Sequence, residues 1–185
     1  MDDFLSSFSL IAFAEMGDKT QLLAIILAAR CKCFWPIFWG MFLATLLNHT
    51  ASAYIGSLAA EHTSSTILEY SIAIIFVLLG LWLLKPDKSP TDIEAKPKYG
   101  YFVTTLVLFF LAEMGDKTQL ATITLGAHYK DTISVILGTT LGMLAVNTPA
   151  ILFGEKIIKM IPLKFVRMIA SALFIGFGIY TLAGY

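Results

Sequence analysis

The chain has few charged residues and few cysteines for its length. Only 14% of its 185 residues are charged, whereas 57% are hydrophobic and the mean hydropathy is +0.78. Soluble domains carry about 25% charged residues, so this composition argues against a soluble protein and indicates an integral membrane protein. The two cysteines, Cys31 and Cys33, are too close in sequence to close a long loop, and we expect them to be reduced and structural.

Six long apolar segments fill most of the chain. A helix that crosses a bilayer needs about 20 mainly apolar residues. These segments are continuous apolar runs rather than the alternating stretches of about ten residues that build a transmembrane β-barrel. We therefore predict an all-α integral membrane fold with six transmembrane helices. The expected spans are residues 4–29, 34–58, 66–84, 101–127, 133–155 and 165–184.

The sequence AEMGDKTQL occurs twice, at residues 14–22 and again 98 positions later at 112–120. Outside the motif, the same offset also pairs identical glycines or threonines at four places without a gap, which indicates a duplication. We divide the chain into a first three-helix repeat (1–84), a linker (85–98) and a second three-helix repeat (99–185). Because each repeat has an odd number of spans, the second enters the membrane from the opposite face, which predicts the inverted-topology repeat of many secondary transporters. The aligned pairs are Gly40 with Gly138, Thr50 with Thr148, Gly56 with Gly154, and Gly80 with Gly178.

Lysine and arginine are distributed unequally over the two faces expected for six spans. Of the 13 basic residues, ten lie in or beside the loops that follow the first, third and fifth spans, and only Lys130 lies on the face that carries both termini. The positive-inside rule then predicts a multi-pass protein of the cell (inner) membrane with both termini outside and the 85–98 linker in the cytoplasm. The ten residues are Arg30, Lys32, Lys85, Lys88, Lys96, Lys98, Lys156, Lys159, Lys164 and Arg167.

Each copy of the motif places charged side chains near the middle of an apolar span. A charged side chain at the centre of a membrane costs at least about 2.5 to 3.5 kcal/mol, so four carboxylates at this depth indicate a function. Two lysines of the motifs, Lys19 and Lys117, offset two of the carboxylates, and the remaining charge matches one divalent cation or two protons. The predicted metal ligands are Glu15, Asp18, Glu113 and Asp116.

The spacing of the motif suggests how its side chains are arranged on a continuous helix. Residues three or four apart share one helical face, so Glu15, Asp18 and Gln21 are expected to lie together. Lys19 is expected to reach back one turn to Glu15, and the second copy repeats this pattern. Carboxylate, amide and hydroxyl oxygens suit Mg²⁺, Ca²⁺ or Mn²⁺.

Further polar residues near the acids are candidates for the same site. A glycine between the two acids permits either a close helix approach or a local break that frees carbonyl groups. Asn48, His49 and Asn147 lie in the following spans, where they either bind the ion or join helices by hydrogen bonds. The additional candidate ligands are Gln21, Gln119, Asn48 and Asn147. The residues expected to tune the site are Lys19, Lys117, Thr20, Thr118, Gly17 and Gly115.

The repeated sequence Glu-Met-Gly-Asp-Lys-Thr resembles the signature of a family of manganese and calcium cation exchangers. That signature is Glu, a hydrophobic residue, Gly, Asp, Lys or Arg, and Thr or Ser. Both copies are intact here, and the resemblance covers all six spans and the charged linker. It implies export of a divalent cation, coupled to protons, with the four motif acids as the ion site. The small size suggests a bacterial member, which implies Mn²⁺ before Ca²⁺.

Together these observations predict a secondary transporter rather than an enzyme. The expected activity is Mn²⁺ efflux by alternating access coupled to proton import, and the alternatives are a Ca²⁺/H⁺ antiporter or a cation channel. No permanent cofactor is expected, because Mn²⁺ or Ca²⁺ is the transported substrate. The expected partners are divalent metal ions, protons and the lipid bilayer, without nucleic acid, and no oligomeric state is predicted.

Overall fold

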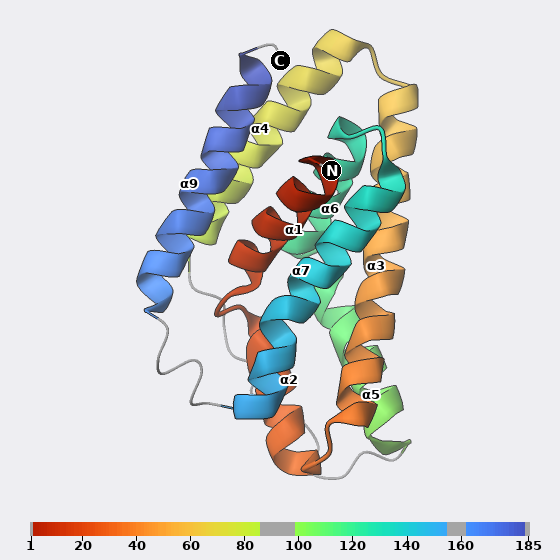
Figure 1. Cartoon of the computed structure of the whole chain (residues 1–185). Coiled ribbons are helices and arrows are strands. Elements are labelled where there is room, and N and C mark those ends of the chain that lie inside the picture. The colour runs from red at the N-terminus through yellow and green to blue at the C-terminus, as the bar shows by residue number, and fades with distance from the viewer. Residues whose placement is uncertain (1, 86–98, 155–161, 184–185) are drawn as a thin grey trace.

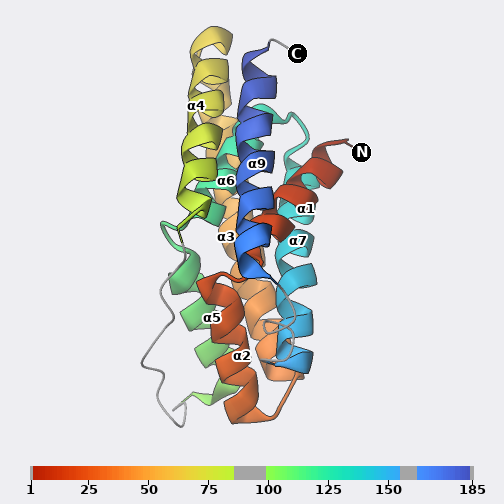
Figure 2. The same cartoon turned by 90° about the vertical axis from the view of Figure 1, so that its left-hand side faces the viewer.

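The computed structural model describes residues 2–85, 99–154 and 162–183, and all regular structure in them is helical. Two long helices, α3 and α7, run alongside a set of shorter ones (Figure 1). Helices α1 and α6 lie beside one half of this long pair, and α2 and α5 lie beside the other half (Figure 2). The described helices are α1 (Asp2–Glu15), α2 (Lys19–Cys31), α3 (Trp35–Glu61), α4 (Ser65–Leu83), α5 (Gly100–Glu113), α6 (Lys117–His128), α7 (Thr132–Phe153) and α9 (Leu163–Leu182).

The two motif copies interrupt the helices of the expected first and fourth spans. A short turn separates α1 from α2, and an equivalent turn separates α5 from α6. At these turns Gly17 has a φ of 80° and Gly115 a φ of 72°, a left-handed conformation that costs glycine little. Of the two roles left open for these glycines, the structure shows the local break, and four helices of 12 to 14 residues stand where the first and fourth spans were expected.

Within the described residues, three helices are long and apolar enough to cross a membrane by length and composition: α4, α7 and α9. Helix α5 is apolar but shorter. Large hydrophobic side chains such as Ile67 on α4 and Phe165 on α9 are exposed, whereas carboxylates such as Glu15 and Glu113 are buried. Apolar side chains outside and charged ones inside are typical of a protein surrounded by lipid.

Helices from the two halves of the chain pack in equivalent ways. A β-carbon added at Gly40 of α3 would lie 2.7 Å from the carbonyl oxygen of Phe102 on α5. A β-carbon at Gly138 of α7 would lie 2.6 Å from the carbonyl oxygen of Phe4 on α1. These four residues form two pairs related by the 98-residue offset, so the glycines that align in sequence also perform the same packing role.

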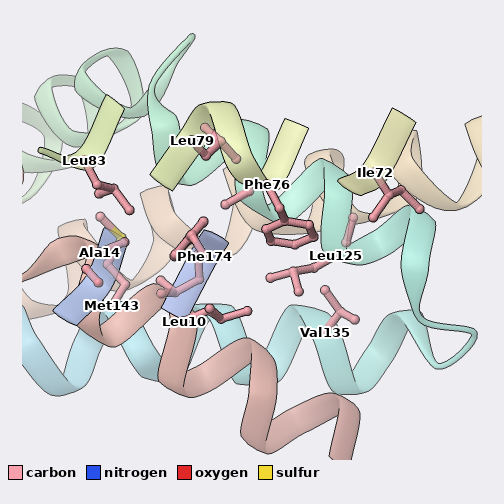
Figure 3. Packing of buried hydrophobic residues seen from close by; sticks show 14 of the residues in the cluster. Leu10, Ala14, Ile72, Phe76, Leu79, Leu83, Leu125, Val135, Met143 and Phe174 are labelled. Carbon is pink, nitrogen blue, oxygen red and sulfur yellow. The ribbon is translucent and has the colours of Figure 1, made fainter. Parts of the chain in front are cut away.

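The larger hydrophobic cluster lies between the α4–α9 pair and helices α1, α6 and α7 (Figure 3). Phe76 of α4 and Phe174 of α9, which are 98 positions apart, touch each other there with ring centroids 5.7 Å apart. A second cluster joins α2, α3, α5 and α7 and includes Met41 and Phe109. Since α1 contributes to the first cluster and α2 to the second, the helix break lies where the two clusters meet.

Cys31 and Cys33 form a disulfide at the end of α2, with α-carbons 5.0 Å apart. The bridge spans Lys32, whose φ of 53° is the one positive value among the non-glycine residues that the structure describes. Our expectation that both cysteines are reduced is therefore wrong.

We predict that Gly138→Ala lowers the thermal stability of the protein. The added β-carbon would press against the backbone of α1, and overpacking of a close interface costs about 1 to 3 kcal/mol. Gly176 in α9 is a matched control, because no atom lies within 4 Å of its added β-carbon. Gly176→Ala should instead stabilise the helix by up to about 1 kcal/mol. Thermal unfolding in detergent measures both changes, and equal shifts would contradict the packing role of Gly138.

Candidate metal centre

Each motif forms a helix break of the same shape, held by its glutamine. The N–H of Gly17 donates to Oε1 of Gln21 at 2.9 Å, and the N–H of Gly115 donates to Oε1 of Gln119 at 2.7 Å. Backbone N–H groups at the start of a helix lack partners within it, so such side-chain bonds stabilise the turn into α2 and α6. The two glutamines that we considered as ion ligands therefore already hold the backbone of the break.

The aspartates of the motifs pair across the two halves of the chain. Asp18 and Asp116 are the N-cap residues of α2 and α6, yet neither side chain caps its own helix. Instead, Nζ of Lys117 lies 3.3 Å from Oδ1 of Asp18, and Nζ of Lys19 lies 3.2 Å from Oδ1 of Asp116. The predicted pair between Lys19 and Glu15 is wrong, because the break removes the helical turn that would have joined them.

Glu15, the last residue of α1, binds hydroxyl groups from both motifs. Thr20 donates to its Oε2 at 2.5 Å, and Thr118 donates to its Oε1 at 2.6 Å. Glu15, Asp18 and Asp116 each offer one carboxylate oxygen, and these oxygens lie within 4.8 Å of one another. We call these three residues the acid triad. Oxygens grouped in this way can surround one divalent cation.

The acid triad is closed to solvent. Its three side chains are buried, and Lys117 beside them is buried as well. A cavity of only about 10 Å³ adjoins Asp18, and Arg167 of α9 contributes to its wall. This volume is about what one water molecule needs. The centre is therefore small and nearly dry, which strengthens electrostatic interactions within it.

Glu113, the fourth predicted ligand, lies beside the acid triad rather than within it. Thr45 of α3 donates to its Oε1 at 3.1 Å, and Nε2 of His49 lies 3.8 Å from its Oε2. Its charge still interacts with the charges of Glu15 and Asp116. The two motif glutamates thus have different surroundings, although the sequence around them is the same.

The two asparagines make hydrogen bonds to main-chain carbonyl groups. Nδ2 of Asn48 donates to the carbonyl of Phe110 on α5 at 3.1 Å, near the end of that helix. Nδ2 of Asn147 donates to the carbonyl of Met143 on its own helix at 3.2 Å. These bonds give the amide nitrogens a structural role, whereas an ion would be bound by the amide oxygens. The buried Oδ1 of Asn147 makes no hydrogen bond to any residue that the structure describes, so both asparagines stay predicted ligands.

Thr45, which the sequence did not mark as part of the site, and His49, for which the sequence left binding of the ion open, both lie against Glu113. They lie one turn apart on α3, and Asn48 and Ser52 are buried on the same side of that helix. A polar stripe at helical spacing within an otherwise apolar segment is the signal that predicts such a face.

We predict that Lys117→Met destabilises the protein more than Lys19→Met does. The side chain of Lys117 is 4% exposed and that of Lys19 is 29% exposed. Removing one partner of a buried ion pair costs about 3 to 5 kcal/mol, and both variants leave a buried carboxylate without its lysine. Because the ammonium group of Lys19 is partly exposed, solvent already weakens its pair with Asp116, and we expect the smaller loss for Lys19→Met. Thermal unfolding in detergent measures the difference.

Asp18→Asn added to the Lys117→Met variant provides the control for this prediction. It should recover part of the lost stability, because it removes the charge left in a buried site. No recovery, or equal losses for the two lysine variants, would argue against the ion pairs described above.

Comparison with known proteins places this chain in a transporter family. A model of the family described as "Divalent cation/proton antiporter GDT1" matches residues 3–91 and 101–185. Over 176 residues, the chain is 43% identical to a Vibrio cholerae protein named "Putative manganese exporter", covering 95% of this chain and 88% of the relative. It is 26% identical over 209 residues to GDT1-like protein 3 of Arabidopsis thaliana, covering 96% and 69%. A GDT1-like protein of Synechocystis is 27% identical over 202 residues, covering 96% and 95%.

The family match identifies the class of protein as a membrane antiporter for divalent cations and protons, which is a transporter rather than an enzyme. The chain belongs to the GDT1 family. The resemblance seen in the two motifs is thereby confirmed. No solved structure matches the chain.

Proposed function

We propose that the protein exports Mn²⁺ from the cytoplasm in exchange for protons, and that the acid triad together with Glu113 binds the ion. The observation that carries this proposal is the acid triad, in which carboxylates from both motifs meet within 4.8 Å. With Lys19 and Lys117 present, the four acids keep a formal charge of two negatives, which one divalent cation or two protons neutralise. Oxygen ligands suit both Mn²⁺ and Ca²⁺. The name of the Vibrio cholerae relative favours Mn²⁺. The ion is then a substrate, and we propose no permanent cofactor.

We further propose that six spans form two inverted three-helix repeats in the cell (inner) membrane. In this arrangement α1 with α2, and α5 with α6, each make one broken span. The repeats are residues 1–84 and 99–185, joined by a cytoplasmic linker at 85–98, and both termini lie outside. The reciprocal aspartate–lysine pairs and the equivalent glycine contacts support this arrangement. Residues 86–98 of the linker lie outside the described part of the chain.

Two helix pairs that the repeat makes equivalent, α3 with α6 and α7 with α2, pack with different closeness. This difference supports alternating access. A β-carbon at Gly56 of α3 would meet the carbonyl oxygen of Ile123 on α6, and one at Gly126 of α6 would meet the carbonyl oxygen of Ala53 on α3. Helices α3 and α6 therefore pack backbone to backbone, on the side where α1 begins and α9 ends. We propose that this contact closes the outer side of the ion site.

The equivalent helices α2 and α7 touch near the motif, where Nε2 of Gln21 donates to the carbonyl of Val146 at 3.3 Å, but they pack less closely on the opposite side of the molecule. A groove of about 510 Å³ lies between them, and its lining includes Ile25, Arg30 and Ile151. The packing around the two motif glycines also differs. A β-carbon added at Gly17 would lie 2.6 Å from the side chain of Leu163 on α9, whereas a β-carbon added at Gly115 would have no atom within 4 Å. We propose that the ion site in this structure opens to the cytoplasm through the groove between α2 and α7. When α2 and α7 close and α3 and α6 separate, the ion is released outside.

Export of a doubly charged ion needs coupling to a second gradient. Moving two positive charges outward against about 100 mV, inside negative, costs about 4.6 kcal/mol. Import of two protons for each ion cancels this electrical cost, so that the pH gradient can drive the exchange. Protons on two of the four acids would also neutralise the site while it returns without metal.

Uptake of Mn²⁺ into inside-out vesicles, with Ca²⁺ and Mg²⁺ as competitors, tests the proposed function. We predict uptake that depends on an acidic vesicle interior, and a loss of at least about tenfold for Glu15→Gln and for Asp116→Asn, since either change removes a charge that balances the ion. Glu61→Gln, at an exposed site at the end of α3, is the matched control and should transport normally.

Three outcomes would change the account. Normal transport by either site variant would contradict the assigned site. Flux that persists without a pH gradient and shows single-channel conductance would favour the channel alternative. Preference for Ca²⁺ over Mn²⁺ would instead favour the Ca²⁺/H⁺ antiporter.

A further inference from the structure

His49 is a buried histidine whose ring makes no hydrogen bond within the described part of the chain. Its side chain, on α3, is 1% exposed. Neither ring nitrogen makes a hydrogen bond to any residue that the structure describes. A buried polar group left in this way costs about 1 to 3 kcal/mol, so its presence calls for a ligand or a functional reason.

The position of the ring identifies Glu113 as the group with which it would share a ligand. Nε2 of His49 lies 3.8 Å from Oε2 of Glu113, which is too far for a hydrogen bond. Metal bonds to imidazole nitrogen and to carboxylate oxygen are about 2.0 to 2.2 Å long, so one ion can bridge atoms at this separation. Thr45 binds the other oxygen of Glu113 and so fixes the direction of the carboxylate.

The second repeat offers no such nitrogen at the equivalent place. The 98-residue offset puts Asn147 opposite His49 and Met143 opposite Thr45. The amide nitrogen of Asn147 is a donor and is already bound to the carbonyl of Met143. A nitrogen ligand can therefore come from the first repeat alone, at the carboxylate of the second motif.

We propose that His49 is a ligand of the transported ion and, with Glu113, makes the site prefer first-row transition-metal cations over Ca²⁺ and Mg²⁺. This inference rests on the proposed function, because it assumes that the motif acids bind the ion. Ca²⁺ and Mg²⁺ take oxygen ligands, whereas imidazole nitrogen is a ligand for transition metals. The oxygens of the acid triad attract any divalent cation, and the nitrogen of His49 adds the discrimination.

Pulsed electron paramagnetic resonance of Mn²⁺ bound to the purified full chain tests direct ligation. We expect modulation from a coupled ¹⁴N nucleus in the wild-type protein and its loss in His49→Asn. The chain has three histidines, so His62→Asn and His128→Asn are matched controls that should keep the signal. Absence of ¹⁴N coupling in the wild-type protein, or its survival in His49→Asn, would overturn the inference.

Competition between Mn²⁺ and Ca²⁺ for the same protein tests the effect on selectivity. We expect His49→Asn and His49→Gln each to lower the preference for Mn²⁺ by at least about tenfold while Ca²⁺ binding is retained. An unchanged ratio, or equal loss of both ions, would overturn the role of His49. If Asp116→Asn abolishes binding while His49→Asn keeps the ratio, this inference fails and the proposed function stands. If the wild-type protein binds neither ion, the proposed function itself fails.

Discussion

Two reciprocal salt bridges between the motifs are the interaction on which the centre of this protein depends. Asp18 pairs with Lys117, and Asp116 pairs with Lys19. In a medium of low dielectric constant, each motif by itself would leave an acid and a lysine without compensation at a cost of several kcal/mol. Because each motif supplies what the other lacks, the two halves of the chain have to meet at this point.

The helix breaks make this exchange possible. On an unbroken helix, Lys19 would point back along its own chain, and both aspartates would need other partners. The turn at each glycine places the aspartate at the start of a new helix, where its side chain can cross to the other motif. The glutamates stay on the preceding helices α1 and α5. A site built at helix ends can therefore bring acids from α1, α2 and α6 within 4.8 Å of one another.

The charges of the centre are paired symmetrically between the two motifs, but the helices around the centre do not pack symmetrically. Helices α3 and α6 touch through glycines, while α2 and α7 leave a groove between them. An exchanger needs two such packings of nearly equal free energy, and a duplicated chain supplies both from similar contacts. In the proposed mechanism, the aligned motifs keep the site common to both arrangements, and residues that differ between the repeats, such as His49 and Asn147, would make the two halves of the site chemically different.

Much of this organisation could be predicted from the sequence, since it depends on identity between distant segments and on charges in apolar surroundings. The two copies of one motif predicted the transporter family and the meeting of acids from both halves, of which the structure brings Glu15, Asp18 and Asp116 together. The helix breaks did not, because a single glycine in an apolar run is compatible with both a continuous and a broken helix. The cross-repeat lysine pairs depended on those breaks. Thr45 and His49 were missed as partners of Glu113, because a contact between α3 and α5 is set by tertiary packing.

The number of Mn²⁺ ions bound by each chain tests the central claim most directly. Equilibrium dialysis of the purified protein, repeated with Asp18→Asn and with Asp116→Asn, compares the contributions of the two motifs. A centre shared by both motifs predicts one ion per chain in the wild-type protein and loss of binding in either variant. Two ions per chain, with one removed by each substitution, would show two separate sites and contradict the account.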